Sequence, residues 1–233
     1  MSVQKNTNYR LTPAPGAEAG ICVLTSTQVE GPFYFPSPER KDIRENRQGM
    51  AMKLRMQILR SPGCAPIEGA VVEVWHTDAT GVYSGYPSEV AHDIWKTVVL
   101  LGMHGVNRRG ELHVEPTEQT TFLRGLQRSD ASGWVEFETL FPGWYEGRVP
   151  HIHFKVFVEG REQLTSQFYL DPATCDEVYT TVAPYNQYGK CPLSFENDIA
   201  LRDNAEALGL LLKPSLPERG QMLAVARIGI QRA

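Results

Sequence analysis

The chain has 233 residues, of which 42% are hydrophobic and 21% are charged, a composition typical of a globular protein with a sizeable core. Its formal net charge is −4, and it lacks the basic stripe of a protein that binds nucleic acid or an anionic membrane surface. The longest apolar run, residues 98–101, is far too short to cross a bilayer, so we expect a cytoplasmic protein with no nucleic-acid or membrane partner.

The chain begins with MSVQKNTNYRLTPAPGAEAG, which contains no apolar core of the kind found in secretory leaders. No repeat, low-complexity tract or change in composition marks a later domain boundary. We therefore divide the chain into an N-terminal extension, residues 1–27, and a single domain, residues 28–233.

Short apolar segments separated by frequent glycine and proline (20 and 16 residues) are typical of an all-β protein. Alternation between apolar and polar residues, or a short run of valines, predicts five strands. They span residues 53–59, 70–75, 134–140, 151–158 and 222–230.

Two short helices are also predicted. Ser88 could cap a helix over residues 89–101, where Val90, Ile94 and Val98 recur at the spacing of one helical face. Ser194 could cap a second helix over residues 197–211. The fold expected from these elements is an all-β sandwich with long loops and one or two short helices.

The four cysteines, Cys22, Cys64, Cys175 and Cys191, are widely spaced and include no CxxC pair. This spacing argues against a structural zinc site. An even number permits two disulfides, but we expect free thiols in a chain of this size without a leader.

The sequence HIH at residues 151–153 is the sharpest chemical signal, because residues i and i+2 of a strand point to the same face. Two imidazoles on one face can share a metal ion, although an isolated HxH pair is more often a pair of partly exposed strand residues. Here Ile152, Phe154 and Val156 form an apolar opposite face, while Phe157 continues the histidine face. This pattern indicates a strand buried on both sides, with a site at one end.

The partners of the two histidines decide which metal site is possible. No histidine follows His153, which excludes a cupin-type site. A site of two histidines and one carboxylate would use Asp130 or Glu146, both in expected turns or loops. Tyr83 and Tyr145 offer a different donor, an anionic phenolate oxygen suited to iron(III), although a tyrosine taken alone is more often a packing aromatic.

Four ordered stretches resemble the intradiol ring-cleavage dioxygenases, the family of catechol, hydroxyquinol and protocatechuate 3,4-dioxygenases. They are VEGPFYF (residues 29–35), GAVVEVWHTDATGVYS (69–84), FLRGLQRSDASGWVEFETLFPGWYEGRVPHIHFKV (122–156) and LTSQFYLDP (164–172). The resemblance covers residues 28–172 and implies a two-sheet core of the transthyretin or immunoglobulin type.

The resemblance also implies a cofactor, an activity and roles for individual residues. Iron(III) would be held by Tyr83, Tyr145, His151 and His153. The enzyme would use O2 to cleave a small catecholic substrate between its two hydroxyl-bearing carbons, giving a cis,cis-muconate-type diacid. Arg148 and Gln167 match residues near the reacting ring, Tyr145 would accept a substrate proton, and Tyr34 could cap the pocket.

The sequence departs from the well-known members in three places. Only five residues separate Tyr145 from His151, which resembles a shorter branch of the pattern GWYxGRxxHIH. Residues 88–116 are longer than expected and could form a lid or a pocket wall. The helical dimerisation segment of the catechol dioxygenases is missing, but relatives in this family are oligomers, so we still expect a homodimer or a larger homo-oligomer.

Two other functions remain open on the sequence. The same sandwich could be a non-catalytic binding module, although all four ligand types are present. The histidine pair His151 and His153 could instead serve a zinc hydrolase together with a carboxylate. Metal analysis would separate these alternatives.

Overall fold

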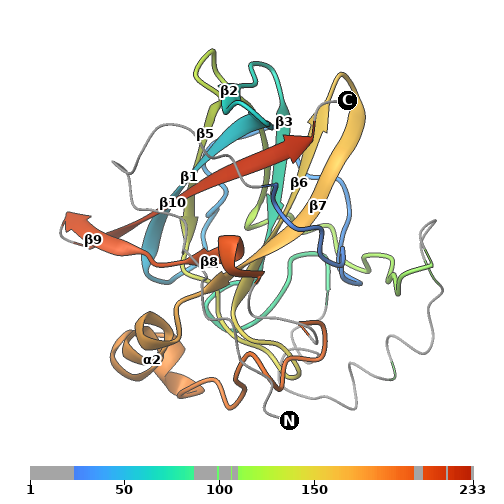
Figure 1. Ribbon diagram of the computed structural model, residues 1–233. Helices are drawn as coiled ribbons and strands as arrows, with labels where there is room; N and C mark the ends of the chain where they lie inside the picture. The colour runs from blue at the N-terminus through green and yellow to red at the C-terminus, as the bar shows by residue number, and fades with distance from the viewer. Residues whose placement is uncertain are drawn as a thin grey trace, which may run out of the picture.

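In the computed structural model, the chain forms two five-stranded sheets (Figure 1). The structure describes residues 24–86, 99, 106, 110–201, 207–218 and 220–231. The first sheet consists of β1 (Ala51–Ser61), β2 (Ala65–Pro66), β5 (Trp134–Leu140), β9 (Ser215–Glu218) and β10 (Gln221–Gln231). The second sheet consists of β3 (Val71–Trp75), β4 (Arg124–Arg128), β6 (His151–Val158), β7 (Arg161–Leu170) and β8 (Leu211–Leu212).

The first sheet buries one face because its strands alternate between apolar and polar residues. Along β1, every second residue from Met52 to Ile58 is fully buried, while Lys53 and Arg55 form ion pairs with Glu136 of β5 on the outer face. β1 pairs with β5 in the antiparallel sense and with β10 in the parallel sense. The first and last long strands of the chain are therefore neighbours at the centre of this sheet.

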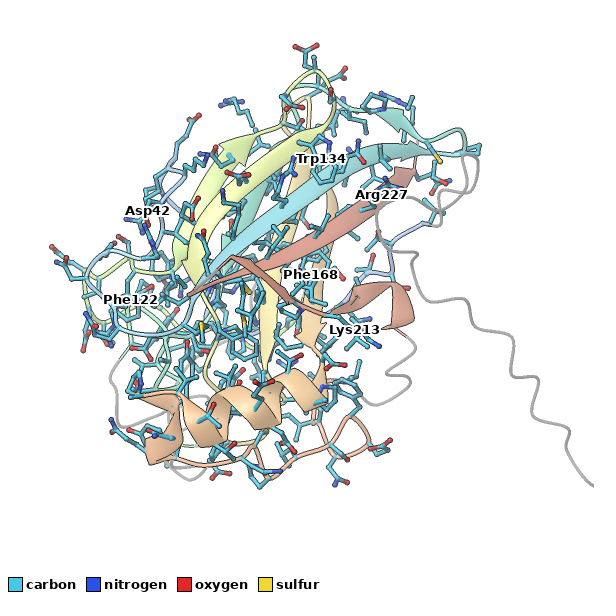
Figure 2. The ribbon with its side chains drawn as sticks, turned by 90° about the vertical axis from the view of Figure 1, so that its left-hand side faces the viewer. Asp42, Phe122, Trp134, Phe168, Lys213 and Arg227 are labelled. Atoms are coloured by element: carbon cyan, nitrogen blue, oxygen red, sulfur yellow. The ribbon has the colours of Figure 1, made fainter. Side chains whose placement is uncertain are left out.

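The hydrophobic core lies between the two sheets. Leu54 and Phe137 of the first sheet belong to one buried cluster with Val74, Phe154 and Phe168 of the second; Figure 2 shows Phe168 between the sheets. Burying a side chain of this size stabilises the fold by about 1.5–3 kcal/mol. The packed core therefore holds the second sheet in a fixed position, and with it the residues on the sheet's other face.

The outer face of the second sheet is also buried, and it carries polar side chains. Trp75 is the cross-strand neighbour of both Arg124 and His153, and His153 is the neighbour of Gln167. All four are at most 2% exposed. The chain before β1 covers this face: the Gln28 amide, for example, donates to the Thr165 carbonyl of β7 at 3.0 Å.

The all-β sandwich and the five predicted strands are confirmed. Five further strands were not predicted: the longer β4 and β7, and the short β2, β8 and β9. Helix α2 (Pro172–Thr181) was not predicted either; it begins after Asp171 and lies beyond one end of the sheets (Figures 1 and 2). The Asp171 carboxylate accepts from the Thr174 amide at 3.1 Å, an N-terminal cap that ends β7 and starts the helix.

The structure tests only one of the two predicted helices. The one over residues 89–101 lies outside the described residues, except for Val99. The one over residues 197–211 is wrong where the structure describes it. Residues 195–197 form a turn, and a short 3₁₀ helix (Ala207–Leu210) leads directly into β8, because Leu211 and Leu212 complete the edge of the second sheet beside β7. Another 3₁₀ helix spans Tyr185–Gln187.

Cys175 and Cys191 are free thiols, as expected. The same expectation is wrong for Cys64, which is disulfide-bonded. No helix among the described residues has the length and apolarity required to cross a membrane.

Candidate metal centre

Four side-chain donors converge on the buried outer face of the second sheet. The Nε2 atom of His151 lies 3.1 Å from Tyr83 Oη, 3.4 Å from Tyr145 Oη and 3.1 Å from His153 Nε2. Donor atoms bound about 2.0–2.2 Å from one metal ion at right angles to each other lie roughly 3 Å apart. The spacing of these donors therefore fits a single ion between them.

Strand β6 brings the two histidines together because His151 and His153 share one face of it. The His151 ring donates from Nδ1 to the Val149 carbonyl at 2.6 Å, which leaves its Nε2 lone pair toward the other donors. The His153 ring stacks on Trp75, with ring centroids 4.8 Å apart and planes 7° apart. These contacts orient both rings before any metal is bound.

Gly31 packs against the edge of the His153 ring. A Cβ at this position would lie 3.0 Å from His153 Cε1, and the backbone φ of +79° is a conformation that residues with a Cβ rarely adopt. Its neighbour Phe33 lies against Tyr83, with ring centroids 5.1 Å apart. The segment before β1 is therefore a wall of the site, and residue types alone did not identify Gly31 or Phe33 as part of it.

The loop after β3 presents Tyr83 and is shaped by Asp78. The Asp78 carboxylate accepts from the amide of Thr80 at 2.8 Å and from that of Val82 at 3.1 Å. The Asp78 amide in turn donates to the Val82 carbonyl at 2.9 Å. Because these bonds close the turn on itself, Tyr83 leaves it in a defined direction.

The loop after β5 presents Tyr145 and rests on the Tyr83 loop. Its Gly143 amide donates to the Asp78 carbonyl at 2.9 Å. The two tyrosine rings meet edge to face, with centroids 5.6 Å apart. The short connection to β6 closes through the Arg148 amide, which donates to the Tyr145 carbonyl at 3.3 Å.

Burial sets the electrostatics of the four donors. It raises the pKa of the Tyr83 and Tyr145 hydroxyls, an effect that the positive charge of Arg148 partly offsets. It lowers the pKa of His151 and His153, so both imidazoles stay neutral, the form in which histidine binds metals. A strongly charged cation would stabilise the phenolates that burial alone disfavours, so this donor set fits such an ion.

A carboxylate-containing site finds no support among the described residues. No group of three or more His, Cys, Asp or Glu side chains there is arranged to hold a metal ion. The Asp130 carboxylate instead caps a turn, accepting from the amides of Ser132 and Trp134 at 2.8 and 2.9 Å. The geometry therefore favours phenolate partners for the histidines over the zinc alternative.

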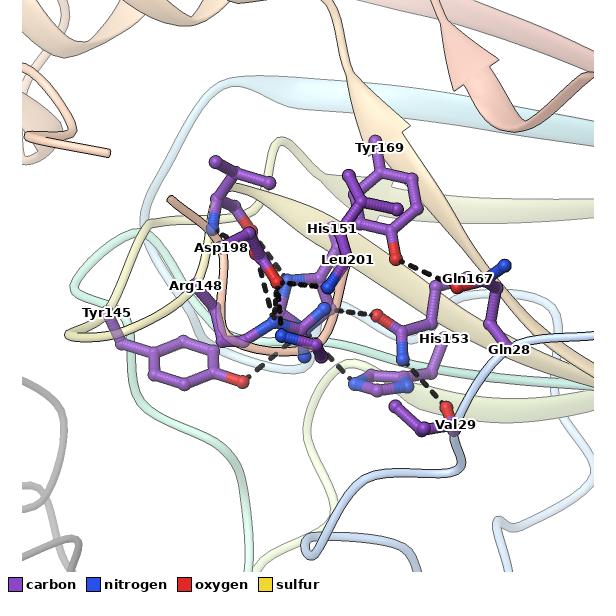
Figure 3. A network of polar contacts seen from close by, with 12 residues as sticks. Gln28, Val29, Tyr145, Arg148, His151, His153, Gln167, Tyr169, Asp198 and Leu201 are labelled. Carbon is purple, nitrogen blue, oxygen red and sulfur yellow. Dashed lines mark hydrogen bonds and ion pairs between the residues drawn. The ribbon is translucent and has the colours of Figure 1, made fainter. Parts of the chain in front are cut away.

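Arg148 and Gln167 lie beside the donors in one buried network (Figure 3). Arg148 Nη2 donates to Gln167 Oε1 at 2.5 Å, and Gln167 Nε2 donates to the Val29 carbonyl at 2.7 Å. The network contains a residue that no sequence signal identified, Asp198, whose two carboxylate oxygens accept from Arg148 Nε at 2.9 and 3.0 Å.

Tyr34 lies behind Trp75. Its hydroxyl donates to Glu73 Oε2 at 3.0 Å, its ring centroid is 5.0 Å from that of Trp75, and Lys155 Nζ lies 3.8 Å from its ring. These contacts attach the segment before β1 to the second sheet. Phe33 is the member of this segment whose ring contacts Tyr83 and Tyr145.

Comparisons with known proteins agree with this geometry. A family model described as Dioxygenase matches residues 29–186. Catechol 1,2-dioxygenase 1 of Acinetobacter lwoffii is 27% identical over 203 residues, covering 75% of this chain and 56% of the relative. A chlorocatechol 1,2-dioxygenase of Cupriavidus pinatubonensis is 29% identical over 157 residues, covering 66% and 58%. The chain thus spans little more than half the length of these relatives.

A solved structure of similar length was also found. The intradiol ring-cleavage dioxygenase of Tetranychus urticae superposes with a TM-score of 0.74 at 27% identity. The match covers 90% of this chain and 95% of that one. The likeness therefore extends through most of the sandwich and beyond the residues of the family model.

Proposed function

This chain belongs to the intradiol ring-cleavage dioxygenase family, and from that membership we propose that it is an iron(III) enzyme that cleaves a catechol with O2. The ring would open between the two hydroxyl-bearing carbons to give a cis,cis-muconate-type diacid. The observation that carries the proposal is the convergence of two phenol oxygens and one imidazole nitrogen at 3.1–3.4 Å from a second imidazole nitrogen, His151 Nε2.

In this proposal the iron would be held by Tyr83, Tyr145, His151 and His153. It would act as a Lewis acid that makes the bound substrate ring reactive toward O2. Residues 28–233 act as one catalytic domain, and the enzyme works as a homo-oligomer. Its partners are a small catecholic substrate and O2. The relatives are named catechol and chlorocatechol 1,2-dioxygenases, which supports this substrate class.

The protein's own residues would move the protons and balance the charge. A catechol gives up two hydroxyl protons on binding, and the Tyr145 phenolate would accept one of them. The buried neutral histidines are poor bases, because burial lowers the pKa of both imidazoles. Arg148 would stabilise the negative charge that develops on the substrate, an effect typically worth about 3 kcal/mol.

Aromatic and aliphatic side chains would exclude water from the substrate ring. Phe33, Tyr86 and Val114 form a buried cluster with the two tyrosine ligands, and each is at most 5% exposed. The Tyr86 hydroxyl donates to the Val114 carbonyl at 2.8 Å and so does not compete for the substrate. Excluding water lowers the local dielectric constant and so strengthens the charge interactions within the site.

The test is metal analysis followed by anaerobic titration with a panel of catechols, then addition of O2 and product analysis. We expect iron, a tyrosinate-to-iron charge-transfer colour that changes on catechol binding, and a product cleaved between the hydroxyls. His153→Ala should lose iron and colour, whereas His113→Ala, a histidine beside Glu115, should keep both. Zinc with hydrolase activity, or ring cleavage beside the diol, would contradict the proposal.

A further inference from the structure

Asp198 lies outside the residues of the family model and is almost completely buried, at 2% exposure. Besides the two contacts to Arg148 Nε, its carboxylate accepts from three backbone amides. These are Val149 at 2.7 Å, Ala200 at 2.8 Å and Leu201 at 3.0 Å. These contacts fix the position of the carboxylate beside Arg148.

The segment around Asp198 is fastened to the short connection between Tyr145 and His151. The Ile199 amide donates to the Gly147 carbonyl at 3.2 Å, and the Cys191 thiol lies 3.9 Å from the Arg148 carbonyl. A short connection brings few anchors of its own. The segment of residues 191–199 therefore anchors the loop that carries Tyr145 and Arg148.

The contacts of Arg148 hold its guanidinium group in one orientation. Nε is bonded to the Asp198 carboxylate and Nη2 to Gln167 Oε1, so two sides of the guanidinium group are fixed. Among the described residues Asp198 is also the one carboxylate that forms an ion pair with Arg148. An arginine buried without such a counter-charge would be costly, and its rigid planar group turns as a unit.

We propose that Asp198 is a positioning residue that sets the direction and the effective charge of Arg148 toward the reacting ring. This inference rests on the proposed function. It differs from a purely structural role, in which Asp198 would only cap the backbone amides of Val149, Ala200 and Leu201. The difference is measurable, because a residue that acts through Arg148 has no effect on turnover once Arg148 is gone.

The experiment compares Asp198→Asn and Asp198→Ala in the native chain and in an Arg148→Ala chain. In the native chain we expect kcat to fall about 10- to 100-fold with a smaller change in KM, since misplacing a catalytic group by about 1 Å costs as much. Iron content and charge-transfer colour should stay unchanged. In the Arg148→Ala chain, the same substitutions should lower kcat less than 2-fold further.

Asp130→Asn is the matched control, because Asp130 also caps backbone amides but lies in an exposed turn away from Arg148. It should leave kcat unchanged. A loss of kcat at Asp198 that is equally large with and without Arg148 would overturn the inference. So would full kcat in Asp198→Asn.

A second measurement does not depend on activity and so separates this inference from the proposed function. NMR of the iron-free protein should show a slowly exchanging Nε–H resonance of Arg148, identified by its loss in Arg148→Ala. The resonance should disappear or exchange rapidly in Asp198→Asn and persist in Asp130→Asn. If the protein cleaves no catechol, the proposed function fails; if the resonance is unaffected by Asp198→Asn, the positioning role fails.

Discussion

Gly143 lies where the loop that carries Tyr145 rests on the loop that carries Tyr83. A Cβ added there would lie 2.5 Å from the Asp78 carbonyl oxygen and 2.7 Å from backbone atoms of Ala79, whereas ordinary contact begins at 3.4 Å. The obstacle is backbone held by the turn around Asp78, so no side chain can move aside. Gly143→Ala therefore has to push the two loops apart by about 1 Å.

The expected loss of stability follows from two terms. Overpacking of this kind costs about 1–3 kcal/mol, and weakening the hydrogen bond from the Gly143 amide to Asp78 costs about 1 kcal/mol. Together they amount to about 2–4 kcal/mol, or a fall in Tm of roughly 4–16 °C for a chain of this size. Because the loops carry two of the proposed ligands, iron affinity should also fall, by about 10-fold or more.

Thermal unfolding and iron content are the assays. Gly209→Ala is the matched control, because a Cβ at Gly209 meets nothing within 4 Å and its φ is not in the left-handed region. Gly209→Ala should keep the native Tm and iron content. The reasoning is refuted if Gly143→Ala unfolds within about 0.5 kcal/mol of the native protein and retains its iron.

Three further predictions follow from the contacts of individual buried residues. Arg148→Ala should keep iron and colour but turn over about 100-fold more slowly; unchanged turnover would remove Arg148 from the mechanism. Lys155→Met, which breaks the buried ion pair to Glu30, should cost about 3–5 kcal/mol in urea unfolding. Lys190→Met, which breaks an exposed pair with Asp176, should cost at most about 1 kcal/mol; equal costs would contradict the difference in burial. Burial lowers the pKa of His76 to about 4, so the folded state resists a proton that the unfolded chain accepts below its ordinary pKa of 6.5. Stability should therefore fall as pH decreases from 6.5 toward 4, and His76→Gln should remove about 2.5 kcal/mol of that fall at pH 4.5; an identical pH dependence in both proteins would be evidence against it.

Local patterns predicted the strands with one apolar face or a dense apolar run, because alternation reports directly which side chains face a core. β7 was not predicted because both of its faces are buried, and the covered face carries Thr165 and Gln167. These polar residues bond to the segment before β1: Thr165 through its carbonyl to the Gln28 amide, and Gln167 to the Val29 carbonyl. A polar residue satisfied by a distant segment looks like a surface residue in the sequence.

The candidate site divides in the same way. The HIH pattern places two imidazoles on one face whatever the rest of the fold does, since the period of a strand is a local property. Tyr83, Tyr145 and Arg148 were predicted from the resemblance of their segments to family motifs. In the structure all three lie beside the histidines. Gly31 and Phe33 belong to the site only because the tertiary fold brings the segment before β1 against His153 and Tyr83.

The sequence by itself determined which residues alternate on a strand and which side chains could bind a metal, because spacing and chemistry are carried along the chain. Only the tertiary structure decided that β1 and β10, far apart in sequence, run side by side. It likewise decided that Asp198 pairs with Arg148 and that Gly143 lies between the loops that carry Tyr83 and Tyr145. Such contacts join segments distant along the chain, and their partners are chosen by the packing of the whole core, which no local pattern encodes.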